Sequence, residues 1–272
     1  MIQVLNAERL QMKFKSGIYP GGEVWVRFEE ASVSPLCFVF ADIWSSDDAM
    51  KLFMVTDALK RMGAETIHLS MPYLPYARQD RVANVGESFS LKVFCQMINA
   101  MQYASVIVTD AHSDVSLALL DRVVNRTSEE VLRQHLPALT LERRLILVAP
   151  DAGAIKKTQK IADAYGLSYV RADKTRDTLT GELSGAVVYS DSVGPDSFLI
   201  VDDICDGGRT FLNLAVELRK FTKGQVNLYI THGIFSAGFK ALSATFDHVY
   251  VANTRYETGD LPSNFHVLKE LT

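Results

Sequence analysis

The densest cluster of residues able to do chemistry follows an apolar run in the second half of the chain. Residues 198–211, FLIVDDICDGGRTF, place two adjacent carboxylates, Asp202 and Asp203, before a turn with two glycines. In a turn that opens a helix, backbone N–H groups and the helix dipole attract phosphate. Paired carboxylates suit the hydroxyls of a diol. We therefore predict a ribose phosphate site, with the diol on the two acids and the phosphate in the turn. The turn consists of Asp206, Gly207, Gly208, Arg209 and Thr210.

An ordinary strand-to-helix turn, with exposed acids and a capping Thr210, is the alternative for this segment. A second cluster, residues 73–81 (YLPYARQDR), follows an expected strand, where the loops of an open α/β sheet build sites. Its prolines and tyrosines favour a rigid loop that presents Arg78. Arg78 and Arg81 also flank Asp80, and could instead form a surface ion-pair cluster.

Three further segments carry chemistry-bearing residues at strand ends. His112 lies in residues 110–114 (DAHSD), and Asp151 lies in PDAG. A lone His at a strand end is usually structural, and we expect the same of His232. Residues 171–176 (RADKTR) open a polar stretch, 173–182, that is short on apolar residues, so we expect a mobile loop there. Solvated charges are the alternative explanation of that stretch.

Short β-branched or aromatic runs alternate with segments of helical period along the chain, which favours parallel sheets flanked by helices. Several strand candidates are nearly all apolar, as strands covered on both faces should be. The expected strands are 36–40, 66–70, 105–109, 144–149, 168–171, 186–190, 198–201, 225–231 and 248–252. The expected helices are 46–62, 88–100, 154–165, 210–221 and 238–244.

The two halves repeat one unit. Residues 38–70 and 145–171 each contain a strand, a loop, a helix and a second strand. The polar stretch 127–144 with Pro137 is the expected joint. We therefore predict two similar α/β domains, residues 1–137 and 138–272, each near the common domain size of about 135 residues. A single large sheet containing both units is the alternative.

Composition excludes several classes of function. The chain has 272 residues, with 28 Lys and Arg against 32 Asp and Glu. It therefore lacks the positive field on which non-specific nucleic-acid binding relies. No apolar run is long enough to cross a bilayer and the first residues contain no apolar region typical of a signal peptide, so we expect no membrane partner and a cytoplasmic location. Cys37, Cys95 and Cys205 are expected to be buried, without disulfides or zinc.

Taken together, the motifs resemble the ribose-phosphate diphosphokinases, also called phosphoribosyl diphosphate synthetases. The segment around Asp202 is similar to the phosphoribosyl diphosphate signature that they share with phosphoribosyltransferases, and residues 73–81 resemble a segment of the diphosphokinases. The resemblance runs from about Gly17 to Thr254 with the motifs in family order. It implies two phosphoribosyltransferase-like domains, each a mainly parallel sheet flanked by helices, within a homo-oligomer of two or more copies.

The resemblance also implies roles for single residues. Arg78 and Gln79 would bind the ATP phosphates, and Glu23 would lie near the adenine. His112 and Asp151 would be the ligands of Mg²⁺, completed by water and ATP phosphates because Mg²⁺ prefers oxygen.

Lys174 and Arg176 match a Lys and an Arg on a family loop that closes over the triphosphate. The resemblance therefore implies catalytic roles for both, since their charges would neutralise the transferred group and closure would exclude water.

Three departures from the family bear on the substrate. Gly21 stands where the family has an Asp beside the adenine, which puts adenine recognition in question. In the phosphate turn Gly207 replaces a Thr and Arg209 replaces a Gly. Arg209 can offer a bidentate guanidinium in place of the lost hydroxyl, so the turn could accept a larger 5-substituent. The chain is also short for the family, so its control by phosphate or ADP could be missing.

The expected reaction transfers a diphosphoryl group from ATP to ribose 5-phosphate, giving 5-phosphoribosyl 1-diphosphate and AMP. Three alternatives stay open. The acceptor could be a 5-phosphodiester such as ADP-ribose, the enzyme could be a phosphoribosyltransferase that consumes the diphosphate, or the chain could be a non-catalytic regulator of a synthetase.

Overall fold

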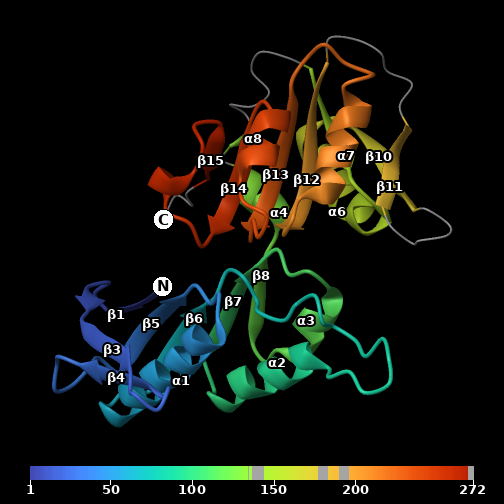
Figure 1. Cartoon of the computed structure of the whole chain (residues 1–272). Helices are drawn as coiled ribbons and strands as arrows, with labels where there is room; N and C mark the ends of the chain where they lie inside the picture. Colours follow the sequence, from blue (N-terminus) through green and yellow to red (C-terminus); the bar gives the residue numbers. More distant parts are fainter. Residues whose placement is uncertain (134, 137–143, 177–182, 190–195, 269–272) are drawn as a thin grey trace. The chain divides into compact units, whose positions relative to one another are not determined.

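The computed structural model describes residues 1–133, 135–136, 144–176, 183–189 and 196–268. The chain divides into two compact units, Met1–Arg126 and Thr127–Thr272 (Figure 1). Each unit holds a mainly parallel β-sheet on which α-helices pack, and this confirms the predicted fold class. The domain boundary after residue 137 stays a prediction. Within the described residues, no helix is long and apolar enough to span a membrane.

The first unit is built on a six-stranded sheet with the order β2-β1-β5-β6-β7-β8. The strands from β5 to β8 run parallel, and β1 pairs antiparallel with β5 and β2. A separate antiparallel hairpin consists of β3 and β4. The strands are β1 (Ile2–Leu5), β2 (Gln11–Met12), β3 (Phe14–Ile18), β4 (Val24–Phe28), β5 (Leu36–Ala41), β6 (Thr66–Ser70), β7 (Ser105–Thr109) and β8 (Val123–Arg126). The helices are α1 (Ser46–Arg61), α2 (Ser90–Ala100) and α3 (Asp114–Leu119).

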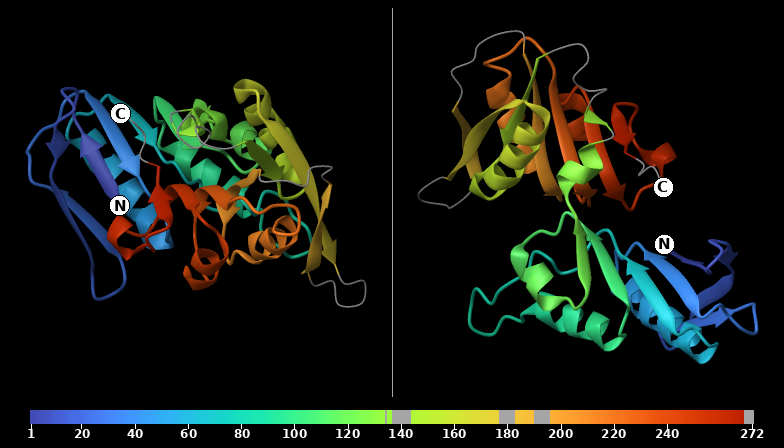
Figure 2. Two further views of the ribbon diagram at one scale, coloured as in Figure 1. Left: turned by 90° about the horizontal axis from the view of Figure 1, so that it is seen from above. Right: turned by 180° about the vertical axis from the view of Figure 1, so that it is seen from behind.

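Helices α1, α2 and α3 lie on one face of this sheet (Figures 1 and 2), as right-handed connections between sequential parallel strands require. Every second strand residue is therefore buried beneath them, and Val39, Leu69 and Val106 are each at most 2% exposed. The residues between them are partly exposed. The apolar sequence of β5 favoured cover on both faces, but the helices of this unit cover only one.

The second unit is built on a seven-stranded sheet with the order β11-β10-β9-β12-β13-β14-β15. All neighbours pair in parallel except β10 and β11. The strands are β9 (Leu145–Ala149), β10 (Ser168–Arg176), β11 (Leu183–Tyr189), β12 (Ser197–Cys205), β13 (Val226–Gly233), β14 (Val249–Thr254) and β15 (Phe265–Val267). The helices are α4 (Ser128–Leu132), α6 (Ile155–Tyr165), α7 (Arg209–Leu218) and α8 (Lys240–Thr245), with 3-10 turns η1 (Ala152–Ala154) and η2 (Thr258–Asp260).

This sheet is covered on both faces. Alternate residues of β9 and β12 enter two separate apolar clusters: Leu147 and Leu199 pack with α4 and α6, and Val148 and Ile200 pack with α7 and α8. Double cover explains why every residue of β9 is buried. The apolar strands of this half therefore behave as predicted.

Sequence signals determine where the longer helices begin and end. Ser45 caps α1 by accepting a hydrogen bond from the backbone N–H of Asp48. Acids occupy the first turn of α1, and Lys60 and Arg61 occupy its last turn, as the helix dipole favours.

In α7 the buried residues recur at helical spacing, which turns one apolar face toward the sheet. These residues are Phe211, Leu214, Ala215 and Leu218.

A buried hydroxyl pair links α1 to the segment that follows α2. The hydroxyls of Thr56 and Tyr103 lie 2.6 Å apart, and both side chains are at most 1% exposed. Because Thr56 donates its own proton to the Leu52 carbonyl, Tyr103 is the donor in this pair. We predict that Thr56→Val destabilises the protein by about 1–3 kcal/mol, since it leaves the Tyr103 hydroxyl buried without an acceptor.

The double variant Thr56→Val/Tyr103→Phe should recover part of that loss, because it removes both polar groups. Urea unfolding followed by circular dichroism measures both changes. A Thr56→Val protein as stable as the unsubstituted one would contradict the assigned bond.

Candidate active site

The order of strands in the second unit reverses between β9 and β12. From β9 the chain moves to β10 on one side, and it later returns to place β12 on the other side. In open α/β sheets, ligands bind beyond the carboxyl ends of the strands at such a reversal. Asp151 follows β9, and Asp202 and Asp203 lie near the end of β12. The topology thus brings three of the predicted acids to one edge of the sheet.

Asp202 and Asp203 lie within β12 rather than after it, because pairing with β13 continues to Cys205. The predicted strand, 198–201, was therefore too short. Successive residues of a strand point to opposite faces. The Asp203 side chain is 7% exposed, and Asp202 is partly exposed. Neither acid is an exposed turn residue, which contradicts the alternative of an ordinary surface turn.

The carboxylates of Asp202 and Asp203 place two negative charges near each other where water has little access. Burial, and then the charge of Asp203, raise the pKa of Asp202 well above its ordinary value. The backbone N–H of Asp203 donates to Asp202 Oδ1 at 2.9 Å, and the charge of Lys157 on α6 also opposes the rise. Lys157 is a site residue that our sequence reasoning missed, since no local pattern sets it apart from the other lysines of its helix.

The turn after β12 requires a glycine at one position. Gly208 has a φ of +79° and directly precedes α7. A Cβ there would lie 3.1 Å from Leu242 of α8, so packing excludes a side chain as well. Among the described residues, no side chain caps α7. A helix that begins without a side-chain cap can receive a phosphate at its first backbone N–H groups.

The rest of the turn is open. Gly207 is exposed, and a Cβ at this position would meet no heavy atom within 4 Å. Arg209 is exposed as the first residue of α7, and Thr210 follows it partly exposed. The Asp206 carboxylate accepts a hydrogen bond from the Ser236 hydroxyl, which ties the turn to the loop after β13.

Cys205, beside this turn, is a buried thiol. Burial first, and then the charges of Asp202 and Asp206, raise the pKa of its thiol to about 12. Cys37, Cys95 and Cys205 are all buried, which confirms the expected burial of the three cysteines. His232 is 2% exposed on β13, as expected for a structural histidine.

Asp151 stands at the end of β9 as the N-cap of η1. Its Oδ1 accepts the backbone N–H of Ala154 at 3.2 Å. The side chain is partly exposed.

The polar segment that begins at Asp173 is not a loop over its first residues. Residues 173–176 extend β10, with Lys174 paired to Ala186 and Arg176 paired to Leu183 of β11. The expectation of a loop at Lys174 and Arg176 was therefore wrong. Low apolar content does not exclude a strand when an antiparallel partner such as β11 satisfies the backbone. Residues 177–182 lie outside the described residues.

In the first unit, the predicted rigid loop follows β6. Its apolar anchors include Leu74, which is 3% exposed, and the partly buried Tyr73, whose ring stacks on Trp44 at 4.9 Å between ring centroids. Arg78 and Gln79 are both exposed. The loop is thus fixed by its apolar residues and presents the two predicted ATP contacts at the surface of this unit.

Asp80 pairs with Arg81, whose side chain is 78% exposed, so part of the ion pairing expected as the alternative is present. Asp80 itself is 8% exposed, and it accepts the Nε of Arg81 at 2.9 Å. Burial raises the pKa of Asp80. Arg81 and the neighbouring Ser113 and His112 lower this pKa by more, so that the net shift is downward. The Asp80 carboxylate of the loop after β6 thus lies near Ser113 and His112 of the segment after β7. Sequence reasoning missed this proximity because the two segments are distant along the chain.

The segment after β7 carries strain next to His112. Asp110 has a φ of +49°, which is costly for a residue with a side chain, and it is 5% exposed. Its backbone N–H donates to the Arg126 carbonyl at 2.6 Å, which holds this conformation. His112 is exposed. Among the described residues, no three His, Cys, Asp or Glu side chains converge as a metal site.

Glu23 lies away from these loops, in the turn between β3 and β4, and is exposed. The departure at Gly21 is coupled to it, because a Cβ at Gly21 would lie 2.5 Å from the Glu23 carboxylate. An Asp at this position would require Glu23 to move.

The part of the chain that carries the loop after β6 matches a protein-family model. Residues 3–101 match the N-terminal domain of ribose phosphate pyrophosphokinase. A solved phosphoribosylpyrophosphate synthetase from Mycobacterium smegmatis has the same fold, with a TM-score of 0.82 over 96% of this chain and 87% of that chain at 22% identity.

Curated relatives extend the likeness through both units. A ribose-phosphate pyrophosphokinase from Thermococcus kodakarensis is 31% identical over 255 residues, which cover 92% of this chain and 87% of the relative. The enzyme of that name from Pyrococcus furiosus is 30% identical over 238 residues, covering 87% of this chain and 84% of the relative. The two acids of β12 and the glycine turn lie where the strand order of the sheet reverses. Because the sequence is also 30–31% identical to these relatives over most of its length, the chain belongs to the ribose-phosphate pyrophosphokinase family.

Proposed function

We propose that this enzyme transfers the β,γ-diphosphoryl group of ATP to the anomeric hydroxyl of ribose 5-phosphate. The anomeric oxygen forms a bond to the β-phosphorus, the bond from that phosphorus to the bridging α,β oxygen breaks, AMP leaves, and the hydroxyl proton passes to solvent. The main support for this proposal is the end of β12, where Asp202 and Asp203 precede a turn with two glycines and the start of α7. Family membership supports the reaction class.

The acids and the turn would bind different groups of the sugar phosphate. The 2- and 3-hydroxyls would donate to Asp202 and Asp203, and these hydrogen bonds would stabilise the crowded carboxylates. The 5-phosphate would bind the turn from Asp206 to Thr210, using the first N–H groups of α7 and the Arg209 guanidinium.

The nucleotide would bind through the first unit. Arg78 and Gln79 are exposed on a rigid loop and can contact phosphate oxygens. The donor chemistry of His112 and Asp151, one imidazole and one partly exposed carboxylate, fits a magnesium ion whose shell is completed by water and phosphate oxygens. When bound, this ion would neutralise phosphate charge. Glu23 would contact the adenine.

Lys174 and Arg176 are the proposed catalytic residues. Diphosphoryl transfer needs positioning and neutralisation of charge more than proton transfer, so two cations suit the step without a strong general base. Their placement in β10 makes them part of a hairpin with β11 rather than of a free loop.

A larger acceptor is the second candidate, and the open turn favours it. Gly207 leaves space that a Thr would occupy, and Arg209 adds a bidentate cation. A 5-phosphodiester such as ADP-ribose would use both features. A non-catalytic regulator is less well supported, because the chain retains both proposed metal ligands and both proposed catalytic cations.

We also propose that the enzyme works as a homo-oligomer in the cytoplasm, where ATP is available. The hairpin of β3 and β4 supports self-association, since Ile18 and Tyr19 near its tip are each 57% exposed.

Comparison of acceptors tests the proposed substrate. Purified protein is incubated with ATP, Mg²⁺ and either ribose 5-phosphate or ADP-ribose, and AMP release is followed by chromatography. We expect faster release with ribose 5-phosphate. A clear preference for ADP-ribose would replace the first candidate by the second, and no AMP release with either would favour the regulator.

Substitution of Lys174 tests the transition-state role. Lys174→Ala should lower kcat by about two orders of magnitude or more with little change in KM, because its contacts would form mainly in the transition state. Lys156→Ala, on the exposed face of α6, is the matched control and should be neutral. An unchanged kcat in Lys174→Ala would remove this residue from the mechanism.

Substitution of Asp202 tests the charge crowding. Asp202→Asn should weaken ribose 5-phosphate binding yet raise the midpoint of thermal unfolding at about pH 8, since it removes a buried charge. The pKa of Asp202 is raised in the folded state, so the unsubstituted protein loses stability as the pH rises above the ordinary carboxyl range. The advantage of Asn should therefore vanish near about pH 4. Thermal scans across this range measure it, and an advantage independent of pH would contradict the assigned shift.

A further inference from the structure

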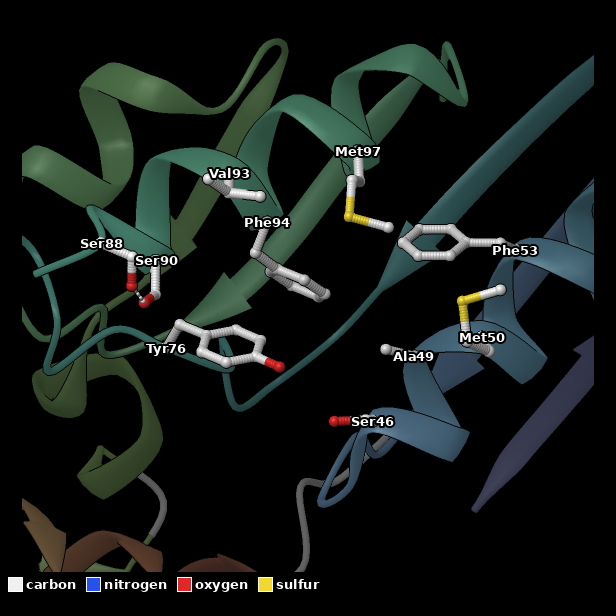
Figure 3. Close-up of a pocket in the computed structure, with 10 residues that line it drawn as sticks. All are labelled: Ser46, Ala49, Met50, Phe53, Tyr76, Ser88, Ser90, Val93, Phe94 and Met97. Carbon is white, nitrogen blue, oxygen red and sulfur yellow. Dashed lines mark hydrogen bonds between the residues drawn. The ribbon is translucent and has the colours of Figure 1, made fainter. Parts of the chain in front are cut away.

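A pocket of about 300 Å³ lies between α1 and α2 in the first unit (Figure 3). Its apolar wall includes Met50 and Phe53 of α1 and Phe94 and Met97 of α2. Phe53 and Phe94 are at most 7% exposed and form a fixed base. Met50 and Met97 are 40% and 41% exposed at the rim. Exposed thioethers beside buried rings form an adaptable surface for a flat apolar ligand.

The polar groups of the pocket gather on one side. Figure 3 shows the hydroxyls of Ser46, Ser88 and Ser90 on the side of Tyr76, away from Phe53 and Met97. No described residue that lines the pocket is charged. An anion would therefore find no cation, and the acids in the first turn of α1 would repel it. A neutral ligand with one polar edge matches this lining.

Tyr76 connects the pocket to the loop that presents Arg78. It has a φ of +63°, and its ring packs on Phe94 at 5.4 Å while remaining 38% exposed. The Tyr76 carbonyl accepts the backbone N–H of Gln79 at 2.8 Å, and the Gln79 carbonyl accepts that of Leu91 at 3.3 Å. The turn that carries the proposed ATP contacts is thus held by one wall of the pocket and by the first turn of α2.

We propose that this pocket binds a neutral, planar, bicyclic heteroaromatic molecule as an effector that tightens ATP binding. The ligand would cover the exposed part of the Tyr76 ring and stabilise its costly backbone conformation. It would thereby favour the arrangement in which Arg78 and Gln79 are presented. The binding does not depend on the proposed function, but the coupling to ATP rests on it.

Indole serves as the probe. Indole-3-acetate, which has the same ring and a negative charge, serves as the comparison ligand. Calorimetry with the full chain should show saturable binding of indole to one site and about tenfold weaker binding of indole-3-acetate. ATP affinity, measured separately, should rise about twofold or more with saturating indole. By linkage, ATP should tighten indole binding by the same factor.

Two methionines of α1 offer a matched pair of variants. Met50 lines the pocket and is 40% exposed, whereas Met54 is 39% exposed and does not line it. Met50→Trp should fill the pocket and weaken indole binding about tenfold or more, while Met54→Trp should change it less than about twofold. Met50→Lys and Met54→Lys provide a second pair that adds charge at exposed positions, with the same expectation.

Each outcome of these binding measurements decides one part of the proposal. No saturable binding, or equal binding by the Met50 and Met54 variants, overturns the pocket. Self-association that is lost in Met50→Lys alone assigns this face to a contact between copies and also overturns it. Indole binding without an effect on measured ATP affinity overturns the effector role. If the unsubstituted protein binds indole but not ATP, the pocket stands, while the effector role and the proposed function fail.

Discussion

Crowding of two carboxylates at the end of a buried strand is the constraint on which the second unit depends. Like charges held near each other in a poorly solvated place repel, and this repulsion lowers the stability of the domain. The fold offsets this cost in several ways: the Asp203 backbone N–H and Lys157 face Asp202, and the pKa of Asp202 rises. Only the carboxyl edge of a sheet covered on both faces can expose such a pair to a substrate. The reversal between β9 and β12 creates that edge, and Gly208 lets α7 begin directly beyond it.

The first unit supplies the opposite charge. Arg78 is exposed on a loop anchored by buried residues, while Asp80, of opposite sign, is turned inward to Arg81 and the His112 segment. Such an arrangement suits diphosphoryl transfer, because a triphosphate would be repelled by the acids that hold the sugar. The exposed Arg78 and the acids of β12 thus belong to different units, and the proposed reaction needs both. The same loop borders the pocket at Tyr76, so local packing in the first unit can influence nucleotide binding.

Much of the fold could be read from the sequence, for reasons that particular elements make plain. Both ends of the strand 66–70 were predicted correctly because apolar pattern and flanking turns agree there. The helix predicted as 88–100 ends at Ala100 as expected but begins at Ser90. Short strands such as β1, β8 and β15 were missed, since a short strand carries little pattern of its own. Residues 173–176 were taken for a loop because pairing with β11 is a long-range effect. Likewise the acids of β12 were recognisable from adjacent residues, whereas Lys157 and the inward position of Asp80 arise from tertiary packing that local sequence does not encode.

The central claim is that the diphosphoryl group moves intact from ATP to the anomeric oxygen of a ribose phosphate. Phosphorus nuclear magnetic resonance of the reaction with ATP, Mg²⁺ and ribose 5-phosphate tests it most directly, because it identifies every phosphorus product. The account predicts AMP and a sugar 1-diphosphate in equal amounts, with no ADP. Formation of ADP with a sugar monophosphate at the anomeric carbon, or release of inorganic phosphate without a sugar product, would contradict it.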